Sequence, residues 1–89
     1  MHAVFSVTVS GDATCRQLAA DVARRYLELV GAPPADVLDL GRQVAATLEA
    51  LSRDGERLEV EFHRNDRTVV VAIAGAGRRH EHRVVLPAS

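Results

Sequence analysis

The chain has 89 residues, of which 47% are hydrophobic and 26% are charged, a composition typical of one small globular domain, here residues 1–89. Its net charge is −1, which excludes the strongly basic surface of nucleic-acid-binding proteins, and its single cysteine excludes an internal disulfide. Charges interrupt the apolar runs too often for a signal peptide or a membrane-spanning helix. We therefore expect a cytoplasmic protein that binds neither nucleic acid nor a membrane.

The first predicted element is a strand over residues 3–9. Phe5, Val7 and Val9 alternate with Ser6 and Thr8, which is the period-two pattern of a strand with one buried face. This strand is short, apolar and without charge. Such a strand is a candidate free edge of a sheet.

An amphipathic helix of about five turns is predicted to follow, because apolar residues recur at helical spacing. Asp12 or Thr14 can accept hydrogen bonds from its first free amides, and Gly31 suits the left-handed residue that ends it. The residues expected on its buried stripe are Cys15, Leu18, Ala19, Val22, Tyr26, Leu29 and Val30.

A second helix is predicted from Pro34, which suits a first helical position, to Leu51, with Asp54 and Gly55 closing the segment. Gly41 lies inside this helix, where it allows the first helix or a partner to approach closely. The expected buried stripe consists of Val37, Leu40, Val44, Leu48 and Leu51.

Residues 57–74 predict a β-hairpin with Asn65 and Asp66 as its two-residue turn, since both tolerate positive φ. The polar residues Glu59, Glu61 and His63 should face outward. With that turn, the facing apolar pairs are Phe62 with Val69, Val60 with Val71, and Leu58 with Ile73.

Residues 75–79 predict a turn that carries Arg78 and Arg79, followed by a last strand that ends before Pro87. Gly75 and Gly77 resemble part of a phosphate-binding loop, but such a loop should open a helix, so a hairpin connection is favoured. His80 and His82 lie on one strand face without a third metal ligand at suitable spacing, so no metal site is predicted.

These elements predict an α+β fold of order β-α-α-β-β-β. Its architecture is a two-layer sandwich, in which two helices cover one face of a mixed, mostly antiparallel four-stranded sheet.

Three segments carry a resemblance to a known family: GAPPADVLDLGRQVAATLEAL, RLEVEFHRNDRTVVVAIAGAG and HRVVLPA. They resemble the connector and nucleotide-facing helix, the hairpin leading to the nucleotide loop, and the closing strand of the GHKL ATPase fold. Within that fold, the chain is most similar to the small anti-sigma-factor kinases and other histidine-kinase-like domains. The resemblance covers most of the chain.

The departures from that family concern its nucleotide site. Ala46 and Ala50 stand where the family keeps a Glu that holds the catalytic water and an Asn that holds magnesium, and Ala74 stands where an Asp reads the adenine. The third helix and the lid are also missing between Gly77 and the last strand. The resemblance therefore implies a shortened, degenerate member with no catalytic residues and no cofactor.

The function that we expect from this resemblance is a non-catalytic, regulatory protein-interaction module. Its partner would be a sigma factor, an antagonist or a related regulator, or a second copy in a homodimer joined through the first strand. The alternatives are a nucleotide-binding, kinase-like anti-sigma regulator and a small metal- or ligand-responsive sensor that uses His80 and His82. The residues proposed for the partner surface are Phe5, Val7, Val9, Arg78, Arg79, His80 and His82.

Overall fold

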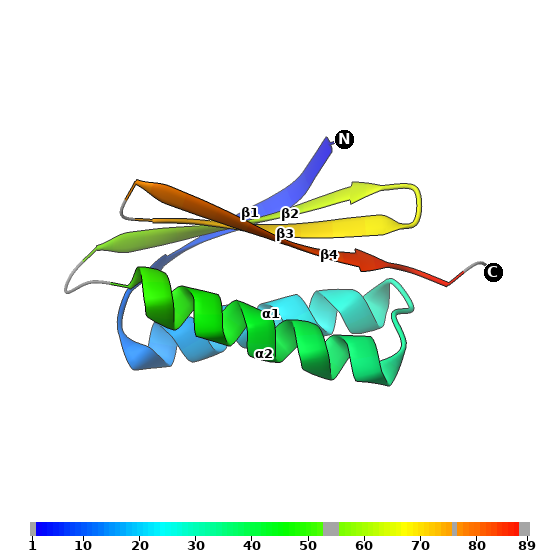
Figure 1. The fold of residues 1–89 in the computed structure, drawn as a ribbon, viewed down its shortest axis with the longest axis horizontal. Coiled ribbons are helices and arrows are strands. Elements are labelled where there is room, and N and C mark those ends of the chain that lie inside the picture. The colour runs from blue at the N-terminus through cyan, green and yellow to red at the C-terminus, as the bar shows by residue number, and fades with distance from the viewer. Residues whose placement is uncertain (1, 53–55, 76, 88–89) are drawn as a thin grey trace.

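Two helices cover one face of a four-stranded sheet in the computed structural model, which describes residues 2–52, 56–75 and 77–87 (Figure 1). The predicted α+β class and element order are confirmed. The elements in chain order are β1 (His2–Ser10), α1 (Ala13–Leu29), α2 (Pro34–Leu51), β2 (Arg57–Asn65), β3 (Thr68–Gly75) and β4 (Arg78–Val85).

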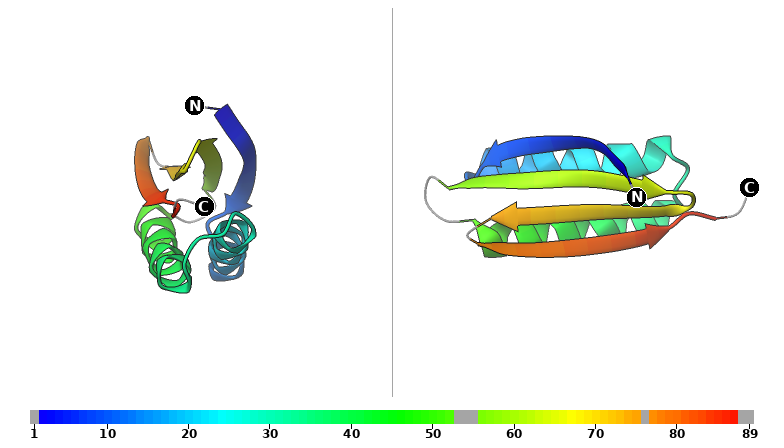
Figure 2. Two further views of the ribbon diagram at one scale, coloured as in Figure 1. Left: turned by 90° about the vertical axis from the view of Figure 1, so that its right-hand side faces the viewer. Right: turned by 90° about the horizontal axis from the view of Figure 1, so that it is seen from above.

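The strands lie in the order β1-β2-β3-β4, and all three neighbouring pairs are antiparallel. The predicted mixed sheet is therefore antiparallel throughout. The reason is visible in Figure 1: α1 and α2 run in opposite directions, so the chain enters β2 antiparallel to β1. Figure 2 shows α1 beneath the β1 side of the sheet and α2 beneath the β4 side, which makes β1 and β4 the two opposite edges.

The helix boundaries follow the expected capping chemistry. The Asp12 carboxylate accepts a hydrogen bond of 2.9 Å from the Cys15 amide at the start of α1. Hydrogen bonds from the Ser10 hydroxyl and from the Cys15 amide lower the pKa of Asp12 to about 2. Gly31 has a φ of 88° just after α1, and Pro34 is the first residue of α2. Asp54 and Gly55 lie outside the described residues.

The buried stripe of α2 is the predicted one: Val37, Leu40, Val44, Leu48 and Leu51 are all buried. Gly41 is also buried and faces α1. A Cβ atom at Gly41 would lie 2.6 Å from Cδ of Arg24, so the absence of a side chain allows the close contact between the helices.

The predicted buried stripe of α1 was partly wrong. Leu18 and Leu29 are 57% and 84% exposed, while Cys15, Val22 and Tyr26 are half-buried. The buried side of α1 is rotated toward α2, where Ala20 lies beside Gly41, and it consists mostly of alanines. Its members are Ala19, which was predicted to be buried, and Ala20, Ala23 and Leu27, which were not.

The predicted hairpin faces are confirmed, but the predicted turn and register were wrong. Asp66 and Arg67 form the turn, Asp66 has a φ of 54°, and Asn65 is the last residue of β2. Phe62 therefore pairs with Val71 rather than Val69, and Val60 pairs with Ile73 rather than Val71. This two-residue shift keeps every side chain on its predicted face, so alternation alone could not detect it.

The connection from β3 to β4 is the expected hairpin rather than a phosphate-binding loop. Gly75 ends β3, Gly77 has a φ of 73°, and the next element is a strand. That strand begins at Arg78, so Arg78 and Arg79 belong to β4 and not to the predicted turn.

Candidate functional site

The outer edge of β1 combines an unpartnered strand with an uncharged sequence. Residues 4–10 contain no charged side chain, and β1 pairs only with β2 within the described sheet. The register with β2 shifts between Ala3 and Phe5, where β1 carries one extra residue. Beyond that bulge, residues 5–10 run in one uninterrupted register. In the described sheet, residues 5–10 therefore present outward-facing backbone donors and acceptors, and they carry no charged side chain that would oppose pairing with another strand.

Three apolar side chains of β1, those of Phe5, Val7 and Val9, point to the helix layer, whereas Val4 at the bulge is 51% exposed. Phe5 stacks on Phe62 with ring centroids 4.4 Å apart, and it meets the edge of Tyr26 at 5.3 Å. Val7 and Val9 are half-buried against the same core. The groups of β1 that another molecule can contact are therefore its backbone edge and the half-buried side chains of Phe5, Val7 and Val9, here called the apolar rim.

Apolar residues on α1 extend this rim. We call Cys15, Leu18, Val22, Tyr26 and Leu29 the α1 flank, since their spacing of three and four residues places them on one side of the helix. Contact between Tyr26 and Phe5 shows that this side faces β1, whereas Arg24 faces α2. The free edge of residues 5–10 and the α1 flank together form one surface, here the β1–α1 edge.

The opposite edge of the sheet is strongly charged. β4 reads RRHEHRVV, and its Arg79 lies 3.0 Å from Glu61 of β2 and 3.4 Å from Glu81. The short Ala72 of β3 lets these side chains meet across the outer face of the sheet. A hydrogen bond from Arg79, and to a lesser extent one from His63, lowers the pKa of the Glu61 carboxyl. Charges of this density on an edge strand oppose pairing with another strand.

His80 and His82 lie opposite the buried residues Ile73 and Val71, so both are on the helix-facing side of β4. The Nε2 atom of His82 is 2.8 Å from the Thr47 hydroxyl of α2. Burial, together with the nearby His80, lowers the pKa of His82. No group of three or more metal-ligating side chains occurs among the described residues.

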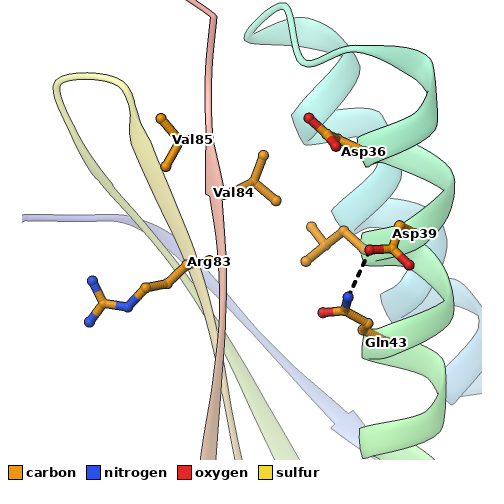
Figure 3. A pocket seen from close by; sticks show the side chains of 7 residues that line it. Asp36, Asp39, Gln43, Arg83, Val84 and Val85 are labelled. Carbon is orange, nitrogen blue, oxygen red and sulfur yellow. Dashed lines mark hydrogen bonds between the residues drawn. The ribbon is translucent and has the colours of Figure 1, made fainter.

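A small cavity lies between α2 and β4 and is drawn in Figure 3. Its volume is about 150 Å³, below the roughly 300 Å³ at which small-molecule pockets begin. Asp36, Asp39 and Gln43 line it from α2, where Gln43 donates a 2.9 Å hydrogen bond to Asp39. Arg83 extends away from the carboxylates in this view, so they are not neutralised by it.

The structure does not bring the predicted partner-surface residues together. Phe5, Val7 and Val9 belong to β1, whereas Arg78, Arg79, His80 and His82 belong to β4 at the other edge. Sequence reasoning missed the α1 flank as a surface because it placed Leu18 and Leu29 in the core. A second helical series, Ala20, Ala23 and Leu27, was the signal that α1 carries more apolar residues than its buried stripe needs.

The three positions that depart from the GHKL pattern lie on two different elements and differ in their exposure. Ala46 and Ala50 are exposed on α2, and Ala74 is half-buried on β3, paired with Glu59 and Arg79.

None of the helices in the described ranges is both long and apolar enough to cross a membrane.

Comparisons of the chain with protein-family models, with curated proteins and with solved structures find no match.

Proposed function

We propose that the chain is a non-catalytic, regulatory protein-interaction module and that the β1–α1 edge is its binding surface. The observation that carries this proposal is the coincidence of a free, uncharged strand edge with exposed apolar side chains on the adjoining helix. Strand addition supplies backbone hydrogen bonds, and an adjoining apolar rim supplies hydrophobic contact area. Among the described residues, Leu18 and Leu29 are 57% and 84% exposed and do not belong to the core cluster.

The distribution of titratable groups supports a non-catalytic role. No polar or charged side chain is buried in the described part of the chain, and the half-buried His82, whose pKa burial lowers, hydrogen-bonds to the Thr47 hydroxyl rather than to a carboxylate that would orient a catalytic base. The resemblance to anti-sigma-factor kinases suggests the class of partner: a sigma factor, an antagonist or a related regulator, or a second copy of this chain.

Site-specific photocrosslinking tests the proposal. A photoreactive benzoylphenylalanine at position 18 should form an adduct with an identified protein, because Leu18 projects from the β1–α1 edge. The matched control is the same residue at position 42, where Arg42 is exposed on α2. Adding Ser6→Lys and Thr8→Lys, both at exposed positions of β1, should abolish the position-18 adduct. Equal adducts at both positions, or none at position 18, would contradict the proposal.

We expect no binding of ATP with magnesium, which separates this proposal from a nucleotide-binding kinase. Ala46, Ala50 and Ala74 supply no oxygen ligand for magnesium and no carboxylate for the adenine. Calorimetric titration measures this directly. A dissociation constant below about 100 μM, equivalent to roughly 5.5 kcal/mol, would favour the kinase-like function instead.

A further inference from the structure

We infer that the partner of the β1–α1 edge is a second copy of this chain, an inference that rests on the proposed function. The two β1 strands pair antiparallel across a two-fold axis at Val7, which joins two four-stranded sheets into one continuous sheet. The two helix layers then lie on the same side of that sheet, with the α1 flanks facing each other.

The register follows from the alternation of β1. In an antiparallel pair, directly opposite residues project from the same face, so helix-facing residues must meet helix-facing residues for both layers to lie on one side. An axis at Val7 places Val7 opposite Val7 and Phe5 opposite Val9 of the second copy. This arrangement uses the regular part of β1 and leaves out the irregularity between Ala3 and Phe5.

The charges of the two edges favour a second copy at β1 rather than at β4. Two β4 strands paired about an axis at Glu81, which keeps their faces matched, would place Glu81 opposite Glu81 and Arg79 opposite Arg83, which brings like charges together. Pairing β1 of one copy with β4 of the next is a heterologous contact, which produces rings or open chains rather than a closed pair. Residues 4–10 carry no charge, so two β1 edges meet without repulsion.

The α1 flank gives this pairing an apolar second layer. Because α1 lies beneath the β1 side of the sheet (Figure 2), the two-fold axis that joins the strands also brings the two α1 helices side by side. Leu18 and Leu29, which are 57% and 84% exposed, lie on that flank. Their burial against the second copy removes the largest exposed apolar side chains of α1 from water.

Two charge variants test both the partner and the register. On the outer face of the sheet, an axis at Val7 places Ser6 of one copy opposite Thr8 of the other. Ser6→Lys with Thr8→Lys therefore puts cations opposite each other, whereas Ser6→Lys with Thr8→Glu puts opposite charges together. Both positions are exposed in the single chain, so each variant should keep its helical and strand content by circular dichroism.

Light scattering at tens of micromolar should show a wild-type mass of twice 9.6 kDa, a monomeric Lys/Lys variant and a dimeric Lys/Glu variant. Dimers of both variants would overturn pairing through β1, and monomers of both would overturn the Val7 register. A wild-type mass that stays at 9.6 kDa on concentration would overturn self-association. If self-association fails, a position-18 adduct with another identified protein would still support the interaction-module function. If no such adduct forms either, both the dimer and the interaction-module function would be contradicted.

Discussion

Phe62→Ala should lower the free energy of unfolding by about 3 to 5 kcal/mol, a large part of the roughly 5 to 15 kcal/mol of a typical domain. Phe62 is fully buried and stacks on Phe5 at 4.4 Å, and its ring also contacts Tyr26 at 5.5 Å. It thus joins β1, β2 and α1. Removing its ring leaves a cavity at the point where these three elements meet.

Chemical denaturation followed by circular dichroism measures this loss. Leu38→Ala is a suitable control, since Leu38 is 56% exposed on α2 and its truncation opens no cavity. An unfolding midpoint unchanged in Phe62→Ala would show that the aromatic cluster does not hold β1 to the rest of the fold.

Ala23→Leu should destabilise the fold by about 1 to 3 kcal/mol, because it forces a larger side chain into a closely packed site. Ala23 is fully buried and belongs to the core cluster that α1 shares with α2 and the strands. Transfer of a leucine side chain from water to an apolar core is more favourable than transfer of an alanine side chain. A gain in stability would therefore mean that the core around Ala23 has room for the larger side chain.

Leu29→Ala provides the matched comparison on the same helix. Because Leu29 is 84% exposed, its truncation should change the unfolding free energy of the monomer by no more than about 0.5 kcal/mol. A large loss of unfolding free energy in Leu29→Ala, together with no change in Ala23→Leu, would contradict the observed orientation of α1. It would support the buried stripe predicted from the sequence instead.

The accuracy of the sequence predictions depended on how many solutions each pattern allows. The stripe of α2 has one large apolar residue every three or four positions, so only one face can be buried, and the prediction was correct. In α1, large apolar residues and alanines form two adjacent series. The larger residues, Leu18 and Leu29, were assigned to the core, although the series rich in alanine is the one that is buried.

The register of the hairpin and the set of residues that share one surface could not be predicted from the sequence, for different reasons. Both Asn65 and Asp66 tolerate positive φ, and a two-residue shift leaves all faces unchanged, so only the three-dimensional structure fixes the turn at Asp66. The predicted partner residues Phe5 and His82 both lie on outer strands. Which outer strand lies at which edge depends on strand order, which alternation does not encode.

Hydrogen exchange along β1 tests most directly the claim that the β1–α1 edge is a binding surface. In a single chain, the outward-facing amides of residues 5–10 have no partner in the described sheet and should exchange rapidly. Binding of a second copy should protect them, so their exchange should slow as the protein concentration rises from low to high micromolar, while exchange in β4 stays constant. Exchange in β1 that does not depend on concentration or on any added partner, or protection that appears in β4 instead, would contradict the claim.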